Sequence, residues 1–244
     1  MGRRELRRWE LGARQARNPC TVCEVRDRAV CSALEPGELR RLADIMTQIE
    51  LAPQKTIFYE GDPADYLYNV TRGAIRLHKL LPDGRRQITD FLFPGDFVGL
   101  AVNDVYAYTA ETVDTVHLCR FPSSRLQALI EESPRFERRL LGMASNELVE
   151  AQDQMLLLGR KTAQEKVASF LLMMSKRAAK RGRPSNLIEL PMGRADVADF
   201  LGLSTETVSR TFTQLKTSGV IQLLDNTHVR LKDRGALKHL AEGE

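Results

Sequence analysis

Between Ile49 and Phe121, short apolar runs typical of β-strands alternate with sequences typical of tight turns. The turns read GDP, TRG, LPDG and FPGD, with glycine or proline where the backbone φ angle must be special. Several short strands at such regular spacing argue for a small antiparallel sandwich or jelly roll. The strand-type runs are IELA, TIFYE, YLYNV, GAIRLHKL, RQITDFLF, YTAETV and TVHLCRF.

The pattern becomes helical after Pro122, and from Pro134 to about Lys180 the sequence holds no further proline and only two glycines. Within this stretch, apolar residues recur at alternating steps of three and four, as in the a/d seam of a heptad repeat. So narrow a seam favours pairing with the same helix of a second copy. A helix lying on the β-rich part of its own chain is the alternative. The seam residues are Leu141, Ala144, Leu148, Ala151, Met155 and Leu158.

The last third of the chain predicts two short helices and a hairpin. The basic run Lys176–Asn186 ends in glycine, proline and serine, which marks a linker. A short helix is then expected from Arg194 to Leu201, followed by Gly202 as the turn and a second helix from Ser204 to Ser218. Two short helices joined through such a turn form a helix-turn-helix. The following VIQLL, DNT and HVRLK predict a β-hairpin, and so a winged helix.

The second of these helices has two unlike faces. Val208, Phe212 and Leu215 form an apolar stripe that should pack inward. On another face Arg210 can fork onto a guanine, and Glu206 can accept from the amino groups of cytosine or adenine. The alternative is that these two side chains form only a surface ion pair, worth about 0.3 to 0.5 kcal/mol. The residues expected to bind DNA are Thr205, Glu206, Ser209, Arg210 and Thr213, with Lys216, Arg194 and Lys232 as candidates for phosphates.

The cysteines form a C-x2-C-x7-C set, Cys20, Cys23 and Cys31, with a distant fourth, Cys119, on an expected strand. Four thiolates suit tetrahedral zinc or an iron–sulfur cluster. Zinc sites usually present two close pairs, and the single close pair here leans towards a cluster. The alternative is that Cys119 is a core residue and the others are ordinary thiols. The nearby arginines Arg26, Arg28 and Arg120 are candidates to offset the negative charge of a cluster.

Composition sets broader limits. A chain of 244 residues with 43% hydrophobic content can form one large domain or two smaller ones. Because no run approaches about 18 apolar residues and the N-terminus lacks the apolar core of a secretory signal, a cytoplasmic protein without a membrane contact is expected. Residues 1–18 carry six arginines and predict a mobile basic arm, while the net charge of +4 favours a polyanionic partner only weakly.

Nothing in the sequence indicates an enzyme. The four histidines show no metal-ligand spacing, and the sequence contains no G-x-S-x-G, P-loop or H-E-x-x-H motif.

The order of β-roll, long helix and winged helix resembles the cyclic AMP receptor protein and fumarate–nitrate reduction regulator superfamily. ETVSR, Glu206–Arg210, matches the E-x-x-S-R signature of its oxygen-responsive branch, and Met155–Leu171 looks like the dimer helix of that branch. The spacing of seven residues between the second and third cysteines resembles that of the rhizobial-type nitrogen-fixation regulators, whereas the best-known form of the family has five. The cyclic-nucleotide cassette of the family carries an Arg-Ser pair after Gly-Glu. The corresponding FPGDFVGLAVNDVYAYTAETV lacks it, so no cyclic nucleotide is expected.

The resemblance implies an α+β chain with a cyclic-nucleotide-binding-like β-roll and a C-terminal winged helix-turn-helix. It implies a sensory domain over residues 19–133, a dimerisation helix over 134–180 and a DNA-binding domain over 181–244. Cys20, Cys23, Cys31 and Cys119 would hold an oxygen-labile [4Fe–4S] cluster. A homodimer would then bind a palindrome like TTGAT-N4-ATCAA in double-stranded DNA and act with RNA polymerase. The rivals are a regulator of this fold that senses heme or another small molecule, and a zinc or redox protein whose C-terminal unit contacts proteins.

Overall fold

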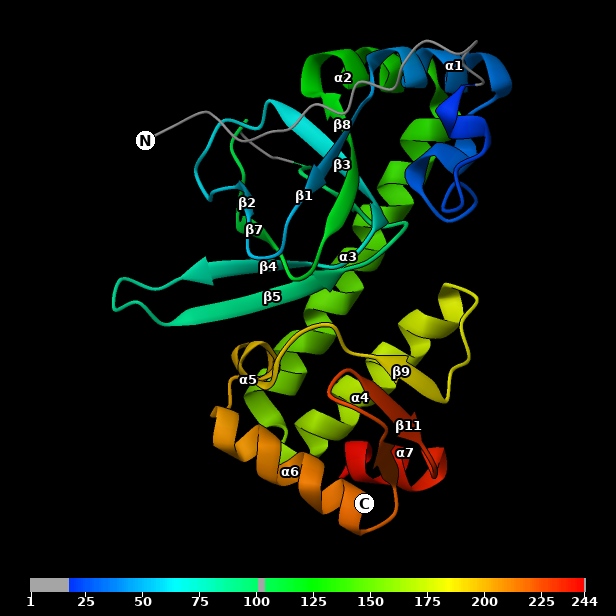
Figure 1. Cartoon of the computed structure of the whole chain (residues 1–244). Coiled ribbons are helices and arrows are strands. Elements are labelled where there is room, and N and C mark those ends of the chain that lie inside the picture. Colours follow the sequence, from blue (N-terminus) through cyan, green and yellow to red (C-terminus); the bar gives the residue numbers. More distant parts are fainter. Residues whose placement is uncertain (1–17, 101–103, 244) are drawn as a thin grey trace. The chain divides into compact units, whose positions relative to one another are not determined.

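The computed structural model describes residues 18–100 and 104–243, so the expected basic arm lies almost wholly outside the described residues. The chain divides into two compact units (Figure 1). Unit 1 comprises Met1–Lys79 and Thr89–Asn146, and unit 2 comprises Leu80–Ile88 and Glu147–Glu244. Among the described residues, no helix combines the length and the apolarity that crossing a membrane would require.

Within its described residues, unit 1 is built around two four-stranded antiparallel sheets in the orders β1-β8-β3-β6 and β2-β7-β4-β5. The predicted β-roll is therefore confirmed, and each of the strand-type runs contains a strand. The additional strand β6 escaped prediction because it has only two residues after the FPGD turn. The strands are β1 Thr47–Leu51, β2 Thr56–Phe58, β3 Tyr66–Arg72, β4 Ile75–Leu80, β5 Arg86–Leu92, β6 Phe97–Val98, β7 Thr109–Thr112 and β8 Val116–Pro122.

The glycines of the predicted turns have the backbone angles that such turns require. Gly61, Gly73, Gly84 and Gly95 all have positive φ, between 82° and 104°. At Gly73 a Cβ atom would also stand 2.4 Å from the carbonyl oxygen of Thr115, so both the backbone angle and the space require glycine.

The two faces of the β1-β8-β3-β6 sheet pack against different layers. Successive side chains of a strand point to opposite faces, so Val116 and Leu118 enter the core between the two sheets, whereas Cys119 and Phe121 enter a second core outside them. The second core is covered by the 3-10 turns η1 Pro19–Thr21 and η2 Val30–Ala33, by the helices α1 Pro36–Ile45 and α2 Ser123–Glu132, and by the start of α3 (Figure 1).

The helical stretch 134–180 is two helices, which corrects the single dimerisation helix expected from the sequence. Helix α3 runs Pro134–Arg160 and α4 runs Ala163–Lys180. Thr162 begins α4 in a capping box with Glu165, a T-x-x-E signal that was present in the sequence. Lys161 holds the turn, because its Nζ donates to Ser169 Oγ and to the carbonyl oxygen of Ala241, each at 2.8 Å.

Unit 2 contains the predicted winged helix. Helices α5 Arg194–Leu201 and α6 Thr205–Thr217 are joined through Gly202, and β10 Ile221–Leu223 pairs with β11 His228–Leu231 as the wing. Two elements were not predicted: β9 Leu187–Glu189, which completes a β10-β11-β9 sheet, and α7 Arg234–Glu242. Asp233 caps the start of α7, because its carboxylate accepts from Ala236 N, and the helix packs on α4.

Candidate functional site

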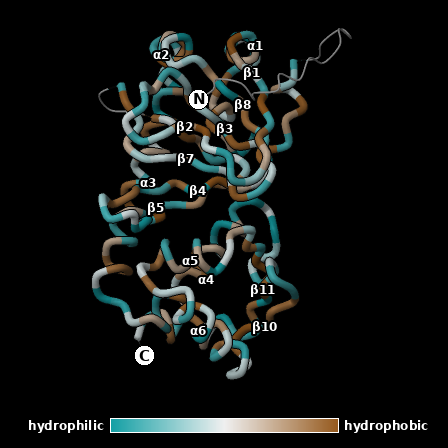
Figure 2. Tube along the Cα trace, turned by 60° about the vertical axis from the view of Figure 1, so that its left-hand side comes forward, coloured by the Kyte–Doolittle hydropathy of each residue, from teal (hydrophilic) through white to brown (hydrophobic). Residues whose placement is uncertain are grey.

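Helix α6 is fixed at both ends and along one side. Ser204 Oγ accepts from Thr207 N at 3.1 Å, and Gly219 follows the helix with φ of 76°. The apolar stripe of Val208, Phe212 and Leu215 is fully buried, as predicted. The mixture of hydrophobic and hydrophilic residues along α6 can be followed in Figure 2. One side of α6 is therefore held by packing, and the opposite side is free to bind.

The residues expected to bind DNA all lie on the exposed side of α6. Glu206 and Arg210 form no ion pair within the part of the chain that the structure describes, so the surface ion pair weighed from the sequence is absent there. Thr213 Oγ1 donates to Ser209 O at 3.0 Å, which leaves that hydroxyl as an acceptor for other partners. The exposed residues are Thr205, Glu206, Ser209, Arg210 and Thr213, with Lys216 beyond them.

An open groove of about 580 Å³ lies between this side of α6 and the start of α4. Arg210, Thr207 and Gln214 line it from α6, and Thr162 and Gln164 line it from the first turn of α4. The N-terminal end of a helix carries partial positive charge, and the Arg210 guanidinium adds a full charge. The groove suits an anionic group such as a phosphate.

Arg194 is not among the exposed cations. Its guanidinium carbon lies 3.6 Å from the centre of the Phe212 ring, and burial lowers the pKa of the group. The side chain packs α5 against α6 through a cation–π contact. This corrects the expectation that Arg194 contacts phosphates, and leaves Lys216 and Lys232, both exposed, as the candidates.

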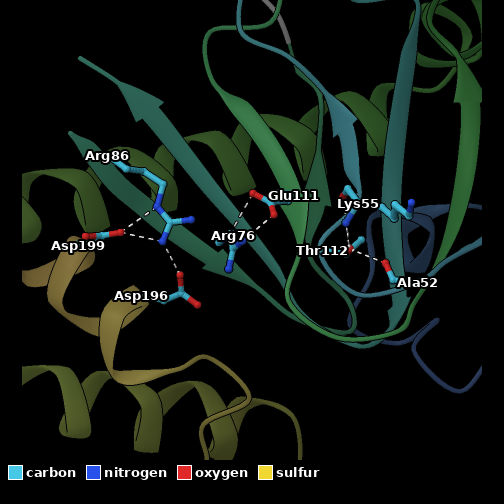
Figure 3. Close-up of polar contacts among 8 residues, drawn as sticks. All are labelled: Ala52, Lys55, Arg76, Arg86, Glu111, Thr112, Asp196 and Asp199. Atoms are coloured by element: carbon cyan, nitrogen blue, oxygen red, sulfur yellow. Dashed lines mark hydrogen bonds and ion pairs between the residues drawn. The ribbon is translucent and has the colours of Figure 1, made fainter. Parts of the chain in front are cut away.

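Helix α5 is anchored by the tip of the β4–β5 hairpin (Figure 3). This tip, Leu80–Ile88, belongs to unit 2. Arg86 donates to Asp196 Oδ1 at 2.7 Å and to Asp199 Oδ2 at 2.8 Å. Gln87 Nε2 donates to the carbonyl oxygen of Asp199 at 2.7 Å, and Gln154 Nε2 to that of Phe200 at 2.8 Å. These bonds satisfy carbonyls at the end of α5, which a helix leaves without internal partners.

The four cysteines converge on the outer core of unit 1. Cys20 lies in η1, Cys31 in η2 and Cys119 in β8, and all three are at least nine-tenths buried. Cys23, partly buried, packs against the same core. A cavity of about 300 Å³ is lined by Cys20, Cys23 and Cys119, together with Gln48 from β1 and Thr71 from β3.

Burial favours the neutral thiol at Cys20, Cys31 and Cys119. Burial, reinforced by Cys23 and Cys20, raises the pKa of Cys31 to about 11, and burial is also the main cause that raises the pKa of Cys20 and Cys119. Within the described residues, no group of three or more His, Cys, Asp or Glu side chains is arranged to hold a metal ion. The donor set fits a thiolate-bound metal group, but binding would have to draw the sulfurs together and release their protons.

Of the three arginines named from the sequence, Arg26 acts on the thiols. Arg26 lowers the pKa of Cys20 and Cys31, against the larger effect of burial. The Arg120 guanidinium lies 4.5 Å from the centre of the Tyr66 ring. Arg120 follows Cys119 along β8, so the two side chains point to opposite faces of the sheet. This corrects the expectation for Arg120.

A β-roll, a long helix with an exposed apolar seam and a winged helix with a free polar face together define a DNA-binding transcription regulator. Residues 48–133 match the cyclic nucleotide-binding domain, and residues 165–240 match the Crp-like helix-turn-helix domain. The chain belongs to the Crp/Fnr family, the superfamily that its sequence resembles.

Its relatives in that family are similar over most of their length. The chain is 43% identical to the nitrogen fixation regulation protein FixK of Bradyrhizobium diazoefficiens over 84% of this chain and 86% of that protein. It is 38% identical to the transcriptional activator protein FnrL of Cereibacter sphaeroides, over 88% of each. The solved structure of FixK2 from Bradyrhizobium japonicum has a TM-score of 0.76 and 39% identity, and covers 80% of this chain and 97% of that one.

The anchor of α5 can be tested by replacing Arg86. We expect Arg86→Ala to speed amide hydrogen exchange in α5 roughly tenfold, because Asp196 and Asp199 lose a shared, partly buried cation. Hydrogen exchange followed by mass spectrometry measures this. Arg85→Ala is the control, since Arg85 is 75% exposed and its ion pair among the described residues is with Asp83 of its own turn. Equal exchange in the two variants would contradict the anchoring role.

Proposed function

We propose that this chain is a homodimeric transcription activator that senses oxygen through a [4Fe–4S] cluster. Cys20, Cys23, Cys31 and Cys119 would hold the cluster, and two copies of α6 would bind a palindrome like TTGAT-N4-ATCAA. The observation that carries the proposal is the meeting of four cysteines, from segments almost a hundred residues apart, in one buried layer beside α3. Activation would involve RNA polymerase, and the protein would act in the cytoplasm.

The cysteine segment fits the role of a group that orders on binding. Three of the four sulfurs come from one short segment of 3-10 turns, and the fourth comes from the centre of a sheet. A bound cluster supplies a centre that dioxygen oxidises and dismantles. The residues of the chain would do the rest: Cys119 would give a fixed point, and Cys20, Cys23 and Cys31 would release their protons as they bind the group beside it.

The same segment contacts the first turns of α3. These contacts could link the state of the cysteines to the dimer seam. Arg139 Nη2 donates to the carbonyl oxygen of Arg28 at 2.9 Å, and Phe136 and Leu140 are buried in the same core as Cys20 and Cys31. Ordering of the cysteine segment would therefore hold the first turns of α3. The seam begins at the next residue, Leu141.

The seam itself is uncovered in the single chain. Leu141, Leu148 and Met155 are 66%, 61% and 71% exposed, and Ala144 and Ala151 are exposed as well. Leu158 differs, because it is partly buried and lies within reach of Gly202. A second copy would bury this apolar row. Pairing would also place two copies of α6 at half-sites about 34 Å apart, which is one turn of DNA.

The relatives support the regulatory part of the proposal. FixK is named for nitrogen fixation regulation and FnrL for transcriptional activation. A cyclic nucleotide is not expected, because the stretch from Phe93 to Val113 lacks the Arg-Ser pair of the family cassette. A regulator of the same fold that senses heme or another small molecule remains the second candidate, and the first experiment below separates the two.

Anaerobic purification tests the cluster. We expect a coloured protein that contains labile sulfide and about four irons per chain, the content of a [4Fe–4S] cluster, and that bleaches in air. Cys119→Ser should lose most of the iron, whereas Ser32→Ala, at the exposed neighbour of Cys31, should keep it. A colourless protein without sulfide would refute the cluster, and a Soret band would indicate heme.

Arg210 tests the reading of DNA. Arg210→Ala should weaken binding to the specific site by about 1 to 3 kcal/mol and relax the preference at one guanine, because a bidentate contact to the base edge is lost. Lys216→Ala should weaken binding to all sequences alike, since a phosphate contact carries no sequence information. Binding titrations on specific and random DNA at one salt concentration measure both. An equal loss on both DNAs for Arg210→Ala would rule out base reading.

The dimer seam is tested by a charge. Leu148→Glu should shift the anaerobic protein towards monomer, because the carboxylate would lie unpaired in the interface. Val149→Glu is the matched control: it introduces the same side chain at the next residue, which is exposed but off the seam. Sedimentation measures the outcome, and an unchanged dimer for Leu148→Glu would count against the seam.

A further inference from the structure

Asn69 lies beside Cys119 at the outer core of unit 1, and no pattern in the sequence singles it out. It belongs to β3 and is directly paired with Cys119 of β8 on one side and with Phe97 of β6 on the other. Cys119 and Phe97 both belong to the outer core, so Asn69 faces that core too. The side chain is only 3% exposed.

The carboxamide of Asn69 is poorly satisfied in this position. Its Oδ1 atom is buried and has no hydrogen-bond partner within the described residues. Its Nδ2 donates to the carbonyl oxygen of the adjacent Val70 at 3.5 Å, a long contact. Buried polar side chains are normally hydrogen-bonded, and an unsatisfied one destabilises the protein. A carboxamide kept in such a place needs another partner.

Thr112, another buried polar side chain of unit 1, has hydrogen-bond partners. Its Oγ1 donates to the carbonyl oxygen of Ala52 at 2.7 Å and accepts from Lys55 N at 2.8 Å (Figure 3). Thr112 is fully buried and fully bonded. A buried polar side chain of this unit can therefore be fully bonded, in contrast to Asn69.

Cys119 is the partner within reach. Residues directly opposite each other in an antiparallel pair have Cβ atoms about 4.5 to 5.5 Å apart, a distance that the side chains of Asn and Cys can bridge. A neutral thiol offers little to an amide N–H, but a thiolate ligand is a strong acceptor. Gln48, the neighbour of Cys119 on β1, is exposed and can bond to water. Asn69 has no such alternative.

We propose that Asn69 is a positioning residue for the cluster, and that its Nδ2 donates a hydrogen bond to the Cys119 sulfur when that sulfur is a metal ligand. This inference rests on the proposed function. A hydrogen bond to a ligating sulfur orients the ligand, stabilises its charge and raises the reduction potential of the centre. Asn69 would thus set how long the cluster survives in air.

Asn69→Leu should have opposite effects on the cluster-free and the cluster-loaded protein. Leucine has a similar size to asparagine and no polar group. In the cluster-free protein the variant should have a Tm about 2 to 4 °C higher, since an unsatisfied buried group is removed. In the anaerobically loaded protein, the visible absorption of the cluster should decay about threefold to tenfold faster on exposure to air, since one hydrogen bond to a charged sulfur is lost. The two effects have opposite signs.

Thr112→Val is the matched control, because it removes a buried polar group that is fully bonded and lies on β7, in the sheet that does not carry Cys119. Its cluster-free Tm should fall, and its cluster should decay at the wild-type rate. If Asn69→Leu does not fold, Asn69→Ala removes the same donor without adding bulk, and the same acceleration is expected.

The outcomes separate this proposal from the function on which it rests. A wild-type protein without iron and sulfide would overturn the proposed function. A loaded wild type whose cluster decays no more slowly than that of Asn69→Leu and Asn69→Ala would overturn the role of Asn69 alone. A lower Tm for cluster-free Asn69→Leu would also overturn it, because the carboxamide would then have partners without a metal.

Discussion

The alternation of side chains along β8 is the constraint on which the arrangement of unit 1 depends. β8 pairs with β1 and β3, so its residues cannot slide without breaking two ladders at once. In that register Leu118 fills the space between the sheets and Cys119 faces the outer core. A shift of one residue would exchange the two faces. The packing that builds the β-roll therefore also fixes where one sulfur stands.

The other three sulfurs depend on that fixed point. They belong to a segment with 3-10 turns and a few apolar anchors, such as Val25, Val30 and Leu34, which insert into the layer formed by Cys119, Phe121 and α3. Such a segment gains its order from tertiary contacts more than from its own hydrogen bonds. A rigid sulfur on a sheet and three on a less regular segment suit a site that closes around its contents.

Local patterns in the sequence predicted the elements well, since their causes are local. The glycine turns, the strand-type runs and the buried stripe Val208, Phe212 and Leu215 each follow from backbone angles or periodicity. The break between α3 and α4 was missed although Thr162 and Glu165 carried a capping signal, because an unbroken apolar period outweighed it.

The predictions were wrong where a side chain contacts a residue that lies in another element of the fold. Arg194 and Arg120 were counted as free cations, but each stacks on an aromatic ring supplied by another element, which no spacing in the sequence reveals. The contacts of Arg86 with α5 and the place of Asn69 beside Cys119 likewise join residues far apart in the chain. The exposed face of α6 and the cysteine set could be named from the sequence, but the residues that support them could not.

The bridge made by Lys161 has a consequence for the end of the chain. The residue lies between α3 and α4, yet one of its two acceptors is the carbonyl oxygen of Ala241, in the last turn of α7. Removing that turn would leave the ammonium group bound to Ser169 alone. The C-terminal helix thus acts as a brace for the joint between the two long helices. Engineering that trims or distorts it changes the joint, even where every residue that faces DNA is left intact.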